Sequence, residues 1–192
     1  MQFLVSTGRH HGFESLEEAR LLLALDFAGD VVEVVAQPFR LRFATADGWR
    51  HHTPDFLAVT GAGTGTWLLD VRPAGRIQDD DRVCFAASAE AALACGWRYL
   101  VVSGWRPHVM TTLDTLSSQR RELTDRLHLQ AVLLGATAAG PRRFGELVAA
   151  TVAPPVARAQ LLHLLWHRRL GIDLAEPLTD ATRVWAVGGG LQ

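Results

Sequence analysis

Alternation between apolar and polar positions divides the chain into helical and extended stretches. Residues 14–26 carry apolar side chains at helical spacing, which predicts an amphipathic helix that ends near Gly29. Residues 31–35 are mostly β-branched and predict a strand. A second strand is predicted over 39–43, where large apolar side chains alternate strictly with arginine.

A hairpin and a central strand follow in the pattern. Asp47-Gly48 is a strong hairpin-turn signal, and the return strand is predicted over 49–60. The stretch 67–71 is apolar at nearly every position, as in a strand that is covered on both faces. We expect this strand to lie in the middle of the sheet.

A helix and a further strand complete the first part of the pattern. Asp79, Asp80 and Asp81 suit the start of a helix, where the backbone amides are unpaired, and Gly96 suits its end. The strand predicted over 97–102 comes after this helix and should therefore run parallel to its neighbour. The order of elements predicts an α/β fold, with a mixed sheet flanked by helices.

The character of the chain changes after Pro107. Residues 110–131 read as a polar helix, 142–151 and 155–170 as two more helices, and 172–174 and 183–187 as two short strands. Helices followed by a small hairpin resemble a winged-helix module, with Trp166 and Trp185 expected in its core. We predict two domains, 1–120 and 121–192.

Composition limits the classes of function. The chain has 192 residues, of which 48% are apolar and 20% charged, so it should fold into globular domains. A net charge of -1 predicts weak DNA binding by the chain alone. All 19 basic residues are arginine. Neither a secretory leader nor an apolar run of membrane-spanning length is evident, and we expect a cytoplasmic protein.

Two acidic residues lie at the ends of two short apolar runs. Asp55 follows Thr-Pro at a strand, and Asp70 lies inside the predicted central strand. A buried carboxylate is costly unless it is paired or binds a metal, which favours a metal site over a turn carboxylate. The oxygen atoms of Asp55 and Asp70, with the Val71 carbonyl, suit Mg²⁺, for which Mn²⁺ should substitute. Arg72 should project to the same face as Asp70.

Glu18 is open to two interpretations. Ser15 followed by Glu18 forms a capping box, in which the carboxylate satisfies an unpaired backbone amide at the start of the helix. A carboxylate from this helix would also complete a metal site. The residues alone favour the capping role.

Several of these elements together resemble a known family. Four short motifs follow one another over roughly residues 10–105: Glu14-Ser-Leu-Glu-Glu-Ala-Arg-Leu-Leu, Gln37-Pro-Phe, Thr53-Pro-Asp-Phe-Leu and Asp70-Val-Arg-Pro. Their order and spacing are similar to those of the TnsA-like endonuclease subunits of heteromeric transposases. The resemblance implies a restriction-endonuclease-like fold. It also implies a Mg²⁺-dependent active site built from Glu18, Asp55, Asp70 and Arg72, and so favours the second interpretation of Glu18.

The resemblance also implies partners and a reaction. The chain would hydrolyse a phosphodiester of double-stranded DNA at transposon ends, together with a transposase subunit and an ATPase regulator. Gln37 matches the Gln-Pro-Phe element, although its side chain could equally bond the strand backbone near Pro38. His52 is a possible accessory residue at the rim of the site. The alternative for the pair His51-His52 is an exposed strand segment.

Arg72 departs from the family pattern, which has lysine. Arginine cannot lose its proton, so it could hold a phosphate but could not act as a base. Two alternatives therefore stay open: a catalytically impaired nuclease-fold module that binds DNA or protein, and a nuclease of a defence or repair system. His163 and His167 have the i, i+4 spacing of a zinc site, but without further ligands nearby they favour a structural role.

Overall fold

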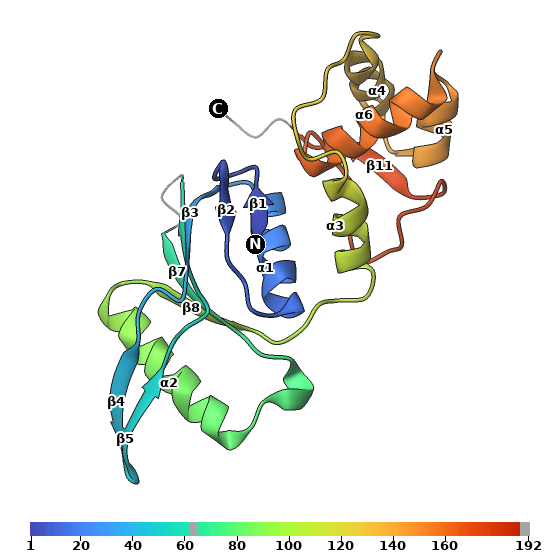
Figure 1. Ribbon diagram of the computed structural model, residues 1–192. Coiled ribbons are helices and arrows are strands. Elements are labelled where there is room, and N and C mark those ends of the chain that lie inside the picture. The colour runs from blue at the N-terminus through green and yellow to red at the C-terminus, as the bar shows by residue number, and fades with distance from the viewer. Residues whose placement is uncertain (62–64, 189–192) are drawn as a thin grey trace. The chain divides into compact units, whose positions relative to one another are not determined.

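The computed structural model describes residues 1–61 and 65–188, and the chain forms two compact units, Met1–Gly104 and Trp105–Gln192 (Figure 1). The boundary was expected near residue 120. It falls earlier because α3 (Val109–Ser117) packs against α6 (Pro154–Trp166) and so belongs to the second unit. Among the described residues, no helix has the length and apolar character needed to cross a membrane.

The first unit is built on a four-stranded mixed sheet. Its strands are β3 (Val31–Ala36), β6 (Phe56–Thr60), β7 (Thr66–Val71) and β8 (Arg98–Val102), in the order β3-β6-β7-β8. The first two pairings are antiparallel, and β7 and β8 are parallel neighbours that a helix connects along the chain. This arrangement confirms the predicted α/β class, including the parallel last strand.

Two helices cover this sheet. α1 (Leu16–Ala28) contacts β3 and β7, and α2 (Asp79–Ala94) contacts β7 and β8, on opposite sides of the sheet (Figure 1). Three successive residues of β7, Leu68, Leu69 and Asp70, are buried, which requires cover on both faces because neighbouring side chains point in opposite directions. β7 is therefore the central strand that the apolar run predicts.

The predicted return strand over 49–60 is wrong as a single element. It is split into β5 (Gly48–His52), which pairs with β4 (Leu41–Thr45) as a separate hairpin, and β6, which enters the main sheet. The break falls around Pro54, which has no backbone N–H to give to a sheet. The chain therefore changes partners directly before Asp55.

Three small elements of the first unit were not predicted. β1 (Gln2–Leu4) and β2 (Arg9–His11) form an antiparallel pair, and η1 (Ala74–Arg76) is a turn of 3-10 helix after β7. His11, in β2, is buried; its Nδ1 donates to the Val34 carbonyl at 2.9 Å, and it accepts from the Thr7 hydroxyl at 2.7 Å. It therefore ties the pair to the sheet.

The second unit is mainly helical with a small sheet. After α3 come α4 (Leu129–Thr137), β9 (Arg142–Arg143), α5 (Phe144–Ala149), α6, β10 (Leu170–Gly171) and β11 (Arg183–Ala186), with strand order β10-β11-β9. The predicted strand over 172–174 lies at 170–171 instead. Trp166 is in the core, as expected, whereas Trp185 is 37% exposed.

The predicted helix over 110–131 is wrong. Two helices replace it, α3 and α4, and residues 118–128 connect them. His128 has the left-handed backbone that ends helical continuity, at φ 54°. The Asp125 carboxylate accepts from the amides of Leu129 at 2.9 Å and Gln130 at 2.8 Å, so it caps α4.

Candidate active site

The register of the sheet brings Asp55 and Asp70 together. Phe56 pairs with Leu69 across the antiparallel β6 and β7, so Asp55, directly before Phe56, lies beside Asp70. The Val71 amide donates to Asp55 Oδ2 at 2.6 Å. Two carboxylates from neighbouring strands therefore meet at one end of the sheet, as the sequence pattern predicts.

Asp70 is held by two side chains from other strands. It is 1% exposed, and its carboxylate accepts from His52 Nε2 at 2.8 Å and from the Tyr99 hydroxyl at 2.6 Å. Both carboxylate oxygens are thus hydrogen-bonded, which offsets much of the cost of burying the charge. His52 reaches this position from β5, and Tyr99 from β8, where it aligns with Leu68.

The contacts of Asp70 raise the pKa values of both partners. The hydrogen bond to Asp70 raises the pKa of His52, so the imidazolium form is favoured. Burial and the same carboxylate raise the pKa of Tyr99, which therefore remains a hydrogen-bond donor. His52 was predicted as an accessory residue. Tyr99 was missed, because nothing in its local sequence separates it from an ordinary strand tyrosine, and only the parallel register of β8 brings it near Asp70.

Asp55 has a raised pKa, as expected for a carboxyl group that is partly buried and lies among other negative charges. Burial raises its pKa to about 6, the charges of Asp70 and Glu18 add to this shift, and the Val71 amide and His52 oppose it. A carboxyl group in such surroundings favours a proton or a metal cation nearby. Among the causes of the shift is the charge of Glu18, on α1, which acts on Asp55 across the site.

Glu18 does take part in capping α1. Its carboxylate accepts from the Ser15 hydroxyl at 2.8 Å and from the Glu14 amide at 2.9 Å, while the Glu18 amide donates to the Ser15 hydroxyl at 3.1 Å. In a capping box the carboxylate would accept from the amide of Ser15, whereas here it accepts from the amide of Glu14. A role for Glu18 in the active site stays a prediction.

Arg72 is turned toward α2. Its Nε donates to Asp81 Oδ2 at 3.3 Å, and the same oxygen accepts from the Gln78 amide at 2.9 Å in a capping box. The side chain of Arg72 is 44% exposed. The cation therefore lies near the carboxylate pair in sequence but is paired with the first turn of α2.

Gln37 supports Asp55 through its backbone. Its amide donates to the Asp55 carbonyl at 2.8 Å, and its φ of 49° is unusual for a residue other than glycine. This geometry fixes the end of β3 against the start of β6. The side chain of Gln37 is exposed and is not needed for this backbone bond, so both of its predicted roles stay predictions.

The donor set fits a divalent cation in part. Among residues 1–61 and 65–188, no group of three or more His, Cys, Asp or Glu side chains is arranged to hold a metal. Mg²⁺ in phosphate-processing sites is commonly bound by one or two carboxylates, with water and substrate oxygens completing the shell. Asp55 and Asp70 fit that arrangement, because each carboxylate oxygen has a second lone pair. Glu18 as a third ligand stays a prediction.

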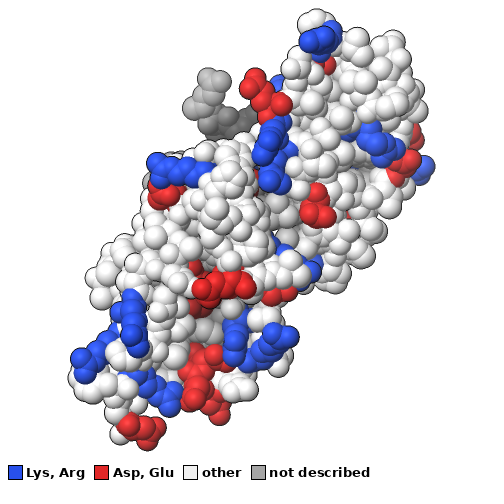
Figure 2. All heavy atoms as spheres, viewed as in Figure 1, with Lys and Arg blue, Asp and Glu red and all other residues white. Residues whose placement is uncertain are grey.

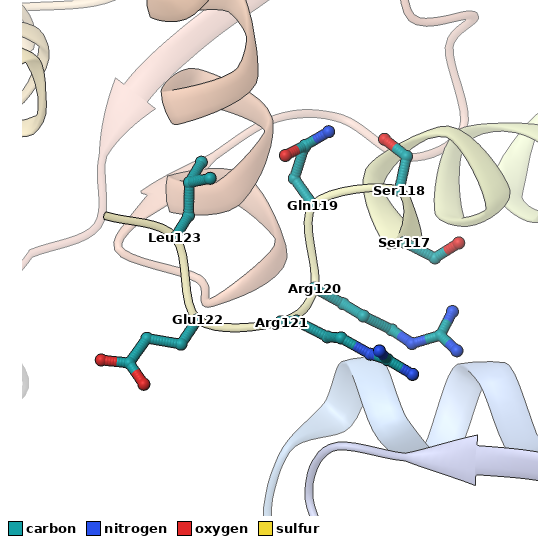
Figure 3. Close-up of a pocket in the computed structure, with 7 residues that line it drawn as sticks. All are labelled: Ser117, Ser118, Gln119, Arg120, Arg121, Glu122 and Leu123. Carbon is teal, nitrogen blue, oxygen red and sulfur yellow. The ribbon is translucent and has the colours of Figure 1, made fainter. Parts of the chain in front are cut away.

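His163, on α6, and His167, directly after that helix, have a structural role in this geometry. His163 Nδ1 donates to the Gln119 carbonyl at 2.9 Å, and His167 Nε2 donates to the Arg120 carbonyl at 3.1 Å. They hold the segment 117–123, which lines a pocket of about 230 Å³. In Figure 3 the side chains of Arg120 and Arg121 lie side by side, and that of Glu122 points away from them.

Comparisons with known proteins give no match: neither the protein-family models nor the curated proteins contain one that matches this chain.

Proposed function

We propose that the chain is a metal-dependent DNA endonuclease subunit of the TnsA-like, restriction-endonuclease-like type. The observation that carries the proposal is the pair Asp55 and Asp70, placed by register at the same end of the two neighbouring strands β6 and β7. The order α1, β3, β6, β7, α2, β8 supports it, because the motif residues then stand at the end of a mixed sheet covered on both sides by helices.

Each residue of the site has a separate task in this proposal. Asp55 and Asp70 would hold Mg²⁺, with the Val71 carbonyl as a further oxygen donor. When bound, the ion would supply Lewis-acid activation of water and of the scissile phosphodiester. His52 and Tyr99 fix the orientation of the Asp70 carboxylate, as partners of metal ligands do elsewhere.

Arg72 would bind the phosphate. A guanidinium carries a permanent charge and a fork of donors that matches phosphate oxygens. Its task is therefore charge stabilisation and not proton transfer. The substrate would be double-stranded DNA at transposon ends, and a transposase subunit and an ATPase regulator would bring the chain to it.

The second unit is proposed as a winged-helix-like docking module. A helix, a strand, two helices and two strands follow one another from α4 to β11, with the strand before the helices at the edge of the small sheet. The sequence from residue 105 onward contains ten arginines and seven acidic residues, a formal charge of +3. This surplus suits an acidic partner surface or DNA.

Cleavage of an end-labelled DNA duplex tests the proposal. We expect Mn²⁺- or Mg²⁺-dependent nicking by the chain with its transposase partner, and loss of nicking in Asp55→Asn and Asp70→Asn. Nicking that persists in both variants, or that proceeds equally in EDTA, would contradict the proposed site. Unfolding curves of the variants serve as the control for folding.

The impaired-nuclease alternative is favoured by one contact. Arg72 is paired with Asp81 in this structure and not with the carboxylate pair. If the wild type binds DNA without cutting it and Arg72→Lys restores cutting, the chain is a nuclease-fold binding subunit. If Arg72→Lys cuts no better than the wild type, the arginine is not what limits the reaction.

A further inference from the structure

The hairpin formed by β4 and β5 has two different faces. Its register pairs Leu41 with His52 and Phe43 with Arg50 on one face, and Arg42 with His51 and Ala44 with Trp49 on the other. The members of the first set are half-buried and those of the second set are exposed. Side chains on a two-stranded ribbon alternate in this way when one face is bound to the rest of the domain.

The inner face is anchored to the candidate active site. His52 donates to Asp70, and its ring lies 6.4 Å from the ring of Phe85 on α2. Arg50 donates to Asp80, also on α2, at 2.9 Å. The hairpin is therefore held in a defined position beside the carboxylate pair, with its inner face toward that pair and its outer face exposed on the other side of the ribbon.

The outer face combines cations with an exposed aromatic ring. Trp49 is 63% exposed, and the guanidinium of Arg42 lies 4.3 Å from the centre of its ring. Arg40, directly before β4, and His51 are also exposed. Figure 2 shows basic side chains gathered at the lower left, over this hairpin, with acidic atoms near its tip.

The local charge is opposite to that of the unit that carries it. Residues 1–104 contain nine arginines and thirteen acidic residues, a formal charge of -4. A DNA strand entering the carboxylate pair would meet repulsion over much of this unit. The hairpin carries exposed positive charge on an element that is anchored to Asp70, and so offers attraction close to the carboxylate pair.

We propose that the outer face of the β4–β5 hairpin, formed by Arg40, Arg42, Trp49 and His51, binds the DNA strand that leads into the Asp55–Asp70 site. The inference rests on the proposed function for the identity of the partner. The arginines bind the phosphodiester backbone, and Trp49 stacks on a base, a combination that single-strand-binding surfaces use. The contact with Arg42 holds the Trp49 ring in place on the outer face, and most of the ring remains exposed to a partner.

Binding of fluorescein-labelled DNA, followed by anisotropy in EDTA at low salt, tests the inference. One arm uses a duplex and the other a single strand of the same sequence. We expect Arg42→Ala to weaken binding of both, and to reduce the slope of log K against log salt by about 0.9 on the duplex. Trp49→Ala should weaken single-strand binding roughly 5- to 100-fold and duplex binding less.

The matched control is Arg98→Ala. Arg98 is also exposed and also lies over a tryptophan, with its guanidinium 5.1 Å from the ring centre of Trp67, but it is on β8. It removes the same charge and should leave affinity within about twofold of the wild type. Arg42→Lys keeps the charge and should restore most of the duplex affinity.

Three outcomes would overturn the inference: wild-type affinity in Arg42→Ala/Trp49→Ala, an equal loss in Arg98→Ala, or no DNA binding by the wild type. Because the assay contains no metal, its outcome is separate from cleavage. Hairpin-dependent binding without cleavage in Mg²⁺ leaves the inference standing and counts against the proposed nuclease. Metal-dependent cleavage together with DNA binding that does not depend on the hairpin supports the proposed nuclease and counts against the inference.

Discussion

Replacing Asp55 with asparagine should stabilise the protein at pH 8 and leave its stability nearly unchanged at pH 4. Burial and the nearby charges of Asp70 and Glu18 raise the pKa of Asp55 from 3.8 to about 6. The folded state therefore holds this proton more tightly than the unfolded state does. The contribution to stability is fully present below pH 3.8, declines as the pH rises, and is lost above the folded pKa of about 6.

The size of the effect follows from that shift. A shift of this size corresponds to an upper limit of about 3 kcal/mol, at about 1.36 kcal/mol for each pKa unit. Asp55 is only partly buried, and solvent screening reduces this limit to about 1 to 2 kcal/mol. Asparagine has nearly the same shape and can still accept from the Val71 amide, so the substitution removes the charge and keeps the hydrogen bond.

Urea unfolding of both proteins, followed by circular dichroism from pH 4 to pH 8 without metal, measures the difference. The two stability curves should coincide near pH 4 and separate through pH 6, with the variant above the wild type. Parallel curves across this range would refute the idea that Asp55 lies in an excess of negative charge. A variant that is less stable at pH 8 would refute it more strongly.

Three further predictions follow from the same structure. Tyr99→Phe removes the donor to the buried Asp70 carboxylate and should lower the free energy of unfolding at pH 7 by about 1.5 to 3 kcal/mol, measured by urea titration. The loss should be smaller when Tyr99→Phe is made in a protein that already carries Asp70→Asn. Mn²⁺ should raise the melting temperature of the wild type more at pH 8 than at pH 5, where protons compete for Asp55, and calorimetry should show this increment abolished in Asp55→Asn. Gly171→Ala would place a Cβ 2.4 Å from Trp185 Nε1 and should destabilise the second unit by about 1 to 3 kcal/mol, measured by thermal melting. Gly135→Ala on α4 should not, because a Cβ there would meet no atom within 4 Å apart from its chain neighbours and the backbone of its own helix.

The sheet could be predicted from the sequence because its signals are local and agree with one another. The apolar run of β7, the acids at the start of α2 and Gly96 after it each favour one structure. The change of partner at Pro54 was not predicted, since a strand that leaves one ribbon and enters another keeps its alternation on both sides of the break. Only the missing amide of the proline marks the place.

The residues of the candidate site also differ in how far the sequence predicts them. Asp55 and Asp70 carry their own signal, since acids at the ends of apolar runs are costly to bury. Tyr99 and the exact partner of Arg72 depend on register and on the packing of α2, which the local sequence does not report. The split of the predicted helix at residues 118–128 has a similar cause, because Asp125 caps α4 through its side chain, and a single aspartate in a polar stretch has no distinctive pattern.

The contact between Arg72 and Asp81 is a weak obstacle to the proposed phosphate-binding role of Arg72. It joins one nitrogen to one oxygen at 3.3 Å, and the Arg72 side chain is 44% exposed. Ion pairs of this kind contribute about 0 to 1 kcal/mol, whereas a phosphate offers the guanidinium two charged oxygens at once. Asp81 would keep its capping bond to the Gln78 amide after losing the arginine, so α2 would retain its first turn. In the proposed reaction, a DNA phosphate at the Asp55–Asp70 pair would therefore have the advantage over Asp81, and the arginine would move to it at small cost.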